Sequence, residues 1–408
     1  MVNLRNYLKS RLSSNLRKPI GRRHLLALPH PPRCRAPIGL RVPGALALCT
    51  VVLLTTMSTA LSACAPRPDN LVEGITIPRV TIKMVDQKTG WALRGARVLR
   101  TTDGGRTWAD VGPGDALHPE GTDAAFIDTT HAVLAVSLTG DSQDDSGLRV
   151  YRTSDAGKTW ESTDLPGAAV AGRLSFLNES EGWLTLHQGA GMHHEQVTIL
   201  ATTDGGRTWA EVSTTSPDAK PGELPFSGNK SGLAFSDSSN GFVTGYWPVP
   251  GNPYLFHSSD GGHTWTQVEL ALPEGYEEAD CSTHTPVFFG GGSGVLPMTL
   301  YTPVGTREIL FYSTTDGGAT WVPGTPIATG EENASWDAPA TGVVIVAAQG
   351  KLHASIDGGK TWSTMTPNID FGSDGPLTLS FITQKVGWAL VDGKLMKTTD
   401  GGATWKRT

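Results

Sequence analysis

Seven aspartates recur at the same place in a repeated octapeptide of the form Ser/Thr-x-Asp-Gly/Ala-Gly-x-Thr-Trp. Carboxylates at such regular positions have the chemistry of metal ligands. The neighbouring residues favour a structural role, because glycine adopts the positive φ that a tight turn needs and an aspartate accepts hydrogen bonds from the turn's own amides. The tryptophan is expected to bury its ring on the hairpin. The predicted structural residues are Asp103, Trp108, Asp155, Trp160, Asp204, Trp209, Asp260, Trp265, Asp316, Trp321, Asp357, Trp362, Asp400 and Trp405.

Two smaller groups also contain side chains that bind metals. The segment Met192-His193-His194-Glu195, with His187 nearby, has ligand types for zinc or copper, but its Gly-rich surroundings give it no fixed spacing. An exposed loop is the favoured interpretation. The segment Cys281-Ser282-Thr283-His284 has too few partners for a zinc site, so a buried free thiol is expected. No metal site and no cofactor is predicted.

The spacing of the octapeptides predicts the fold that must position these residues. Successive aspartates are 41 to 56 residues apart, a period typical of a solenoid or a propeller. Around each copy the sequence alternates in period two, which indicates strands. Each unit is therefore predicted to have four antiparallel strands, with the octapeptide between the third and the fourth. The predicted fold class is all-β, a single seven-bladed β-propeller over residues 80–408. Its first and last units each supply four strands, so no strand exchange is expected at ring closure. Pairing of residues 71–79 with the last blade is left open.

The octapeptide resembles the Asp-box, or BNR, repeat of bacterial sialidases, sortilin-type receptors, xyloglucan-cleaving glycosidases and the photosystem II assembly and stability factor family. The resemblance covers about residues 81–408 and is specific for the fold, whereas the same repeat serves all of these functions. A single ring with Gly-Trp pairs at 90–91, 182–183 and 387–388 looks most like the assembly factor family. That resemblance implies an extracytoplasmic scaffold that holds a partner protein.

The resemblance also raises glycoside hydrolysis as an alternative. A sialidase needs three arginines around the substrate carboxylate, but only Arg79 and Arg173 lie at inner strands, and the Phe/Tyr-Arg-Ile-Pro motif is missing. A general glycosidase needs only two opposed carboxylates. Candidates at the ends of inner strands are Asp86, Asp128, Glu179, Glu181 and Asp237. They lie in hairpin turns, where short polar side chains are expected anyway, so no catalytic residue is predicted. A cell-surface glycoside hydrolase or carbohydrate-binding protein remains the alternative function.

Three aromatic residues form the candidate partner-contact loop. Tyr246, Trp247 and Tyr254 lie in a Pro-rich segment of the fourth unit. Exposed aromatic side chains on a rigid scaffold are typical contact points for a protein or a sugar. The same rings can instead fill the space between blades, and the sequence slightly favours this packing.

The N-terminal region has the layout of an export signal. Residues 44–61 form an uncharged apolar run that follows three arginines, and the run ends in Leu61-Ser62-Ala63-Cys64, which matches the bacterial lipobox. Residues 1–63 are thus predicted to be a lipoprotein signal peptide, with a long n-region or a start codon placed too far upstream. Residues 64–79 are the lipidated Cys64 and a short linker. An uncleaved anchor helix is the alternative. Either puts the protein outside the cytoplasm, and the first anchors it through membrane lipid.

The charge distribution restricts the partners. The 408 residues have 33 basic and 39 acidic side chains, and ten of the basic ones precede Cys64, where there is no acid. This leaves 23 against 39 after it, a charge of about −16, which argues against a nucleic-acid binder. We therefore expect an extracytoplasmic, membrane-anchored scaffold that binds a protein partner, with the assembly or stability of a membrane complex as one such role. The oligomeric state is left open.

Overall fold

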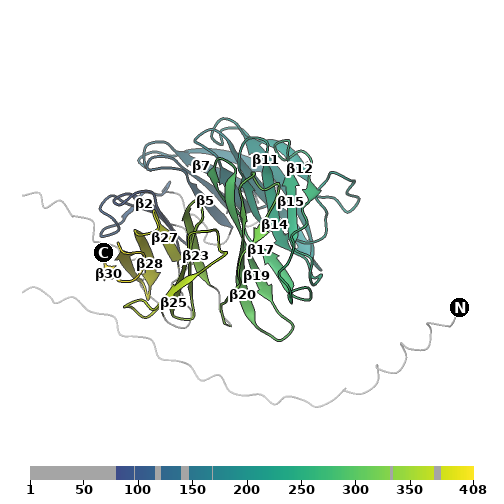
Figure 1. Ribbon diagram of the computed structural model, residues 1–408. Helices are drawn as coiled ribbons and strands as arrows, with labels where there is room; N and C mark the ends of the chain where they lie inside the picture. The colour runs from purple at the N-terminus through teal and green to yellow at the C-terminus, as the bar shows by residue number, and fades with distance from the viewer. Residues whose placement is uncertain are drawn as a thin grey trace, which may run out of the picture. The chain divides into compact units, whose positions relative to one another are not determined.

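The computed structural model describes residues 80–95, 97–114, 121–138, 147–167, 169–330, 334–371 and 378–408. All regular elements in these ranges are β-strands (Figure 1), which confirms the all-β prediction. Within the same ranges, no helix is long and apolar enough to cross a membrane. The predicted signal peptide, Cys64, Arg79 and the linker lie outside the described residues.

Five of the sheets in the described ranges are antiparallel and have four consecutive strands each. The first contains β1 (Val80–Met84), β2 (Gly90–Arg94), β3 (Arg97–Thr101) and β4 (Ala109–Asp110). The second contains β5 (Thr122–Phe126), β6 (Ala132–Leu138), β7 (Gly147–Thr153) and β8 (Glu161–Pro166). The third contains β9 (Val170–Phe176), β10 (Gly182–Gly191), β11 (His194–Thr202) and β12 (Ala210–Thr214). Two more follow later in the chain, with β23 (Ser335–Ala340), β24 (Val343–Ala348), β25 (Lys351–Ser355) and β26 (Ser363–Met365), then β27 (Thr378–Phe381), β28 (Gly387–Val391), β29 (Lys394–Thr398) and β30 (Lys406–Arg407).

The fourth and fifth repeat units share one ten-stranded sheet, where separate blades were predicted. The fourth unit supplies β13 (Asn229–Phe235), β14 (Gly241–Tyr246), β15 (Tyr254–Ser258) and β16 (Thr266–Gln267). The fifth supplies β17 (Asp280–Thr283), β18 (Val287–Gly290), β19 (Ser293–Tyr301), β20 (Arg307–Thr314), β21 (Val322–Pro323) and β22 (Ile327–Ala328). A single pair, Tyr246 with Ser282, joins the two units. The inner strand of the fifth unit is also broken, because Pro286 has no N–H to donate and falls between β17 and β18.

Alternating burial explains why the first strand of a unit forms an edge and the second a core strand. In β1, Val80, Ile82 and Met84 are buried while Thr81 and Lys83 are exposed. In β28 all five residues from Gly387 to Val391 are buried, because sheets pack against both of its faces. The two patterns are those of a half-buried and a fully buried strand.

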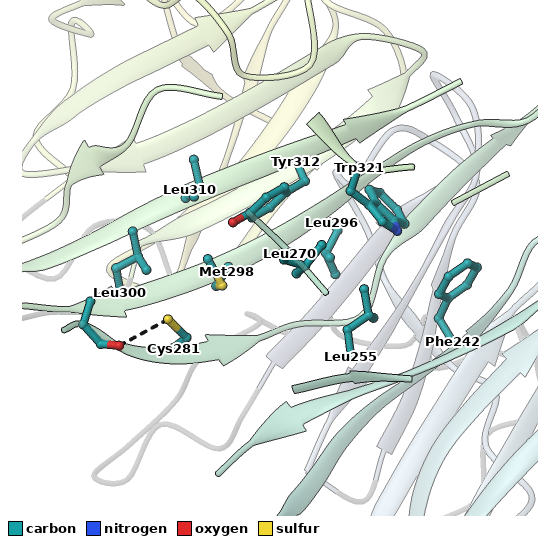
Figure 2. Close-up of a cluster of buried hydrophobic side chains, with 11 residues drawn as sticks. Phe242, Leu255, Leu270, Cys281, Leu296, Met298, Leu300, Leu310, Tyr312 and Trp321 are labelled. Carbon is teal, nitrogen blue, oxygen red and sulfur yellow. Dashed lines mark hydrogen bonds between the residues drawn. The ribbon is translucent and has the colours of Figure 1, made fainter. Parts of the chain in front are cut away.

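Each hydrophobic cluster of the described residues lies between two consecutive repeat units. Figure 2 shows the cluster between the fourth and fifth units, where Phe242 and Leu255 meet Leu296 and Trp321. Cys281 belongs to this cluster as a buried free thiol that donates to the Ala279 carbonyl at 3.3 Å. Burial raises the pKa of this thiol to about 11. The expected free thiol is therefore present and is held in the protonated form.

One cluster joins the last unit to the first. It combines Ile82 and Leu99 of the first sheet with Trp388 and Leu390 of the last. The Ser380 hydroxyl of β27 accepts a hydrogen bond from the Met84 amide of β1 at 2.8 Å. Both sheets are built from their own consecutive strands, as predicted, so side-chain packing and hydrogen bonds close the contact rather than an exchanged strand. Residues 71–79 lie outside the described residues.

Candidate functional site

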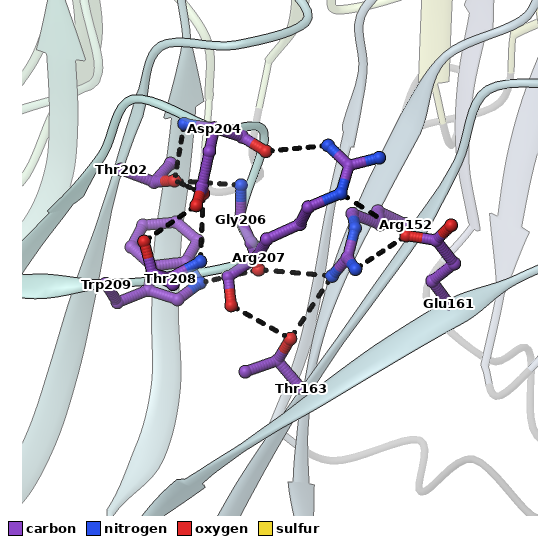
Figure 3. Close-up of polar contacts among 9 residues, drawn as sticks. All are labelled: Arg152, Glu161, Thr163, Thr202, Asp204, Gly206, Arg207, Thr208 and Trp209. Carbon is purple, nitrogen blue, oxygen red and sulfur yellow. Dashed lines mark hydrogen bonds and ion pairs between the residues drawn. The ribbon is translucent and has the colours of Figure 1, made fainter.

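The octapeptide carboxylates accept hydrogen bonds from residues of their own turns. In the third unit, Asp204 Oδ1 accepts hydrogen bonds from the Thr208 amide at 2.8 Å and the Thr202 hydroxyl at 2.9 Å, while Oδ2 accepts from the Thr208 hydroxyl at 2.7 Å (Figure 3). The other six copies repeat these three bonds at 2.6 to 2.9 Å. The two glycines, Gly205 and Gly206, adopt φ of 74° and 85°. Each aspartate thus organises a hairpin instead of presenting free ligand oxygens.

These hydrogen bonds make the octapeptide carboxyls stronger acids. The hydroxyl and then the amide of the following threonine lower the pKa of four aspartates to about 2, from an ordinary value of 3.8. The four are Asp155, Asp316, Asp357 and Asp400. A carboxyl whose pKa is lower in the folded chain stabilises the fold above its unfolded pKa, and this contribution is lost as the pH falls through the folded value.

We expect the free energy of unfolding to fall as the pH is lowered from about 4 to about 2. Urea denaturation followed by circular dichroism across this range measures the effect. The Asp316→Asn variant should be less stable at neutral pH and should show a shallower acid dependence. Asp337 acts in the opposite sense at higher pH, because burial raises its pKa to about 6 and its contribution is lost as the pH rises through that value. An unchanged denaturation midpoint between pH 4 and pH 2 would contradict the structural role.

The octapeptide tryptophans differ more than the sequence indicates. Trp108, Trp265, Trp321 and Trp405 are buried, whereas Trp160, Trp209 and Trp362 are half-buried. In four copies the indole N–H donates to the carbonyl of the turn's own second glycine, at 2.8 to 3.2 Å. Two others reach back to the preceding unit, from Trp160 to the Val111 carbonyl at 2.6 Å and from Trp362 to the Thr325 carbonyl at 2.9 Å. These rings therefore stabilise contacts between units as well as their own hairpins.

A second set of tryptophans has a linking role that the sequence analysis missed. Trp183 and Trp388 follow the first glycine of the second strand, and each donates its indole N–H to an octapeptide carbonyl of the next unit. The acceptors are the Gly261 carbonyl at 3.0 Å and the Gly104 carbonyl at 2.9 Å. Trp91 likewise donates to the Asp128 carbonyl of the next unit at 2.8 Å. The recurring Gly-Trp pair is the signal that could have revealed this role.

The carboxylates proposed for glycoside hydrolysis are placed mainly by their own turns. Asp86, Asp128 and Asp237 each accept two backbone amides two and three residues later, at 2.6 to 2.9 Å. Glu181 accepts from the Asn178 side-chain amide at 3.1 Å, and Glu179 is exposed at a turn. Four of the five thus serve the hairpins in which they lie.

The first strands of four sheets line a shared cavity of about 660 Å³. Asp123 of β5 and Arg173 of β9 form an ion pair inside it at 3.3 Å, and the Arg173 Nε donates to the Ser231 carbonyl of β13 at 3.2 Å. The second Asp123 oxygen accepts the Leu174 amide at 2.8 Å. Burial raises the pKa of Asp123, and the Arg173 charge opposes that rise. The pair therefore connects three inner strands, and the sequence analysis noted only Arg173.

A second acidic side chain on an inner strand is held in the same way. Asp337 of β23 accepts the backbone amides of Phe381 in β27 and of Ala338. Burial lowers the pKa of Lys83, while the charge of Asp337 raises it. Lys83 is nevertheless solvent-accessible. Asp123 and Asp337 both use carboxylate oxygens to hold the next inner strand.

The histidine-rich segment contributes to a buried polar network. His187 Nδ1 lies 2.6 Å from Glu195 Oε1, and the second Glu195 oxygen accepts the Lys230 amide at 2.6 Å. The Lys230 ammonium donates to the carbonyls of Phe226, Ser227 and Gly228 at 2.8 to 3.1 Å. Burial lowers the pKa of Lys230 to about 8, while the charge of Glu195 raises it. In the part of the chain that the structure describes, no three potential metal ligands gather at one point.

The three aromatic residues of the candidate partner-contact loop differ in how deeply they are buried. Tyr254 has no exposed surface and is packed against Trp247 and Phe256, which leaves it none to offer a partner. Trp247 is half-buried and donates to the Asn252 carbonyl at 2.6 Å. Tyr246 is also half-buried, with its ring centroid 6.0 Å from that of His193. For Tyr254 the correction is that the ring is not a contact residue: it belongs to the hydrophobic cluster between the third and fourth units, as the packing alternative expected.

Comparisons with known proteins agree with this architecture. The family model described as "Sortilin, neurotensin receptor 3" matches residues 96–230. A xyloglucanase of Paenibacillus sp is 28% identical over 247 residues, which cover 51% of this chain and 23% of the relative. A sialidase of Bacteroides fragilis is 26% identical over 166 residues, which cover 32% of this chain and 30% of that protein.

The photosystem II assembly protein Ycf48 of Thermosynechococcus vestitus is 25% identical over 271 residues, which cover 61% of this chain and 74% of that protein. The chain thus spans less than a third of the two glycosidases and about three quarters of Ycf48. The crystal structure of a xyloglucanase from Xanthomonas campestris superposes with a TM-score of 0.54 at 17% identity, covering 81% of this chain and 54% of that one. The fold is that of a β-propeller, and the chain resembles the sialidase-type and sortilin-type propellers and Ycf48.

Proposed function

We propose that this protein is a binding scaffold that holds a partner protein, and that it does so as a single seven-bladed propeller. The hydrophobic clusters between consecutive units, with one between the last and the first, support a ring of seven units. Dividing the ten-stranded sheet at its one Tyr246–Ser282 pair gives the fourth and fifth blades.

The main support for a binding role is that carboxylates of the described residues hold the fold together. The octapeptide aspartates hold their own turns, and so do Asp86, Asp128 and Asp237. Asp123 and Asp337 hold neighbouring inner strands through backbone amides. A glycosidase needs two carboxyl groups that exchange protons with substrate or water. These aspartates already accept hydrogen bonds from the fold itself, which favours a scaffold over a glycosidase.

The exposed apolar side chains of the third to fifth units provide the contact surface. Met192 is 92% exposed at the β10–β11 hairpin, next to His193, which packs beside Tyr246. Tyr301 is exposed at the end of β19, opposite Asp280 of β17, and Tyr246 pairs with Ser282 of the same strand. Val304, in the following turn, is 84% exposed. Clustered apolar and aromatic side chains are typical of protein contacts.

A comparison of two variants tests this function. The full chain is used to capture partners from membranes of its host by crosslinking. One partner should be recovered with the wild type and lost with a Met192→Ser/Val304→Ser variant. The control is Ile356→Ser, because Ile356 is 67% exposed but lies in the sixth octapeptide. Equal recovery with both variants would contradict the proposed surface.

The second candidate function is glycoside hydrolysis or glycan binding. The cavity that contains Asp123 and Arg173, and the similarity to a xyloglucanase and a sialidase, favour it. Xyloglucan and sialyl-lactose are offered to the wild type and to an Asp123→Asn variant. If the wild type cleaves or binds one of these sugars and the variant does not, glycoside hydrolysis or glycan binding is the function and the scaffold proposal is wrong.

We propose the extracytoplasmic, membrane-anchored location that the predicted lipoprotein signal peptide implies. Diacylated Cys64 anchors the protein to the outer surface of a bacterial membrane, and a linker of about fifteen residues holds the propeller near it. A membrane-protein partner fits this tether. The support for this location is the apolar run followed by the lipobox sequence.

A further inference from the structure

A cavity of about 620 Å³ lies where the first octapeptide meets the last sheet. Five basic side chains line it, from the β1–β2 turn, the octapeptide and strands β29 and β30. They are Lys88, Arg106, Lys397, Lys406 and Arg407. They come from opposite ends of the propeller sequence, so the closing of the ring brings them together.

One carboxylate, Asp103, lies among these five cations, so the lining keeps an excess of positive charge. Asp103 is the acidic side chain of the lining, and its oxygens already accept hydrogen bonds from Thr101 and Thr107 at 2.6 to 2.9 Å. Within the described ranges, none of the five basic side chains forms an ion pair. The chain after Cys64 carries a net charge of −16, with 23 basic against 39 acidic residues. A cluster of unpaired cations is therefore opposite to the overall charge of the body.

Lys397 is fixed in this cavity. Its ammonium lies 4.5 Å from the ring centroid of Trp388 and 3.5 Å from the Gln87 carbonyl. Burial, and then the charge of Arg106, lower its pKa. Both cations line the same cavity, so their charges repel one another, and a bound anion would relieve this repulsion.

The third unit provides an internal contrast, because it repeats the same octapeptide, TTDGGRTW. Its arginine, Arg207, lies 3.5 Å from the Glu161 carboxylate, which also pairs with Arg152 at 2.6 Å (Figure 3). Arg106 occupies the equivalent place in the first unit without such a partner in the described chain. The excess of positive charge is therefore a property of the closing interface and not of the octapeptide.

We propose that this cavity binds a ligand through phosphate groups that carry at least two negative charges. Arginine guanidinium groups bind phosphate oxygens through paired hydrogen bonds, and lysines add point charges. A single carboxylate would balance one of the five cations. The volume accommodates more than one phosphate group, which fits a diphosphate or a phosphorylated headgroup. The same chemistry is offered by a soluble phosphate compound and by a phospholipid.

Calorimetric titration of the full chain with inorganic pyrophosphate at low ionic strength tests the site. The Arg106→Gln/Arg407→Gln variant should raise the Kd about tenfold or more, since each lost charged hydrogen bond weakens binding. Both side chains are exposed, so the variant should keep the wild-type denaturation midpoint. The matched control, Arg207→Gln, should leave the Kd unchanged. Absence of binding to the wild type, or an equal loss in both variants, overturns the proposal.

Two further measurements identify the ligand class. Phosphorus-containing molecules that co-purify with the full chain are identified by mass spectrometry. A co-purified phospholipid would show that the cavity binds a lipid headgroup, and a water-soluble phosphate compound would show that it binds a soluble ligand. Either molecule should be depleted from the Arg106→Gln/Arg407→Gln variant, and equal retention contradicts the site. A poly-glutamate peptide is titrated in parallel. If the peptide binds and pyrophosphate does not, the cavity recognises an acidic protein segment and the phosphate proposal is wrong.

Discussion

Replacing Trp388 by alanine should lower the free energy of unfolding by about 3–5 kcal/mol. The indole is 1% exposed and belongs to the cluster that joins the last unit to the first. Its N–H donates to the Gly104 carbonyl of the first octapeptide at 2.9 Å, and Lys397 lies over its ring. Alanine removes the ring, the hydrogen bond and the platform for Lys397 together. Urea denaturation followed by circular dichroism measures the change.

Two controls separate the parts of this effect. Trp388→Phe keeps most of the apolar contact and removes the N–H donor, so a loss of about 1 kcal/mol is expected. Trp362→Ala removes a half-buried indole from a different interface and should cost less than Trp388→Ala. If Trp388→Ala proves no more destabilising than Trp362→Ala, packing at this interface does not hold the first and last units together.

Local chemistry explains how much of the fold could be predicted. The alternation in β1 and the octapeptide turn involve residues close in sequence, and their preferences agree with the final structure. The break at Pro286 could also be predicted locally, but the pairing between the two units could not. The pairing of Tyr246 with Ser282 depends on where two separate units meet in space, which no local pattern specifies.

The candidate sites show the same division. The role of Asp204 follows from its own turn, whereas Asp123 is explained only by Arg173 and Leu174, fifty or more residues later. The basic cavity is lined by residues such as Arg106 and Lys397, which lie near opposite ends of the propeller sequence. Sequence reasoning found the fold-forming residues because their partners are near. Sequence reasoning missed the clusters of residues that are far apart in the sequence, because these residues come together only when separate units pack against one another.

The second large effect is expected at Glu195, whose replacement by alanine should cost about 3–5 kcal/mol. Glu195 is 8% exposed and accepts from His187 and from the Lys230 amide, both at 2.6 Å. Alanine removes the carboxylate whose charge favours the charged form of the buried Lys230, and it leaves the Lys230 amide without this acceptor. Glu195→Gln keeps an acceptor oxygen and should lose less. Chemical denaturation at neutral pH measures both variants.

The pair of Glu161 and Arg152 supplies the control. It has the same separation, 2.6 Å, but the Glu161 side chain is 60% exposed. The Arg152 side chain is only 14% exposed, yet it keeps hydrogen bonds to the Thr163 hydroxyl and the Gly206 carbonyl, so Glu161→Ala should cost no more than about 1 kcal/mol. Burial raises the pKa of Glu195, but the hydrogen bonds from His187 and Lys230 outweigh it and lower the pKa overall. The contribution of Glu195 is therefore present above its unfolded pKa and is lost as the pH falls through the folded value. The difference between wild type and Glu195→Ala should narrow in acid, and a difference that stays constant down to the acid limit would show that packing, and not the charge, makes Glu195 stabilising.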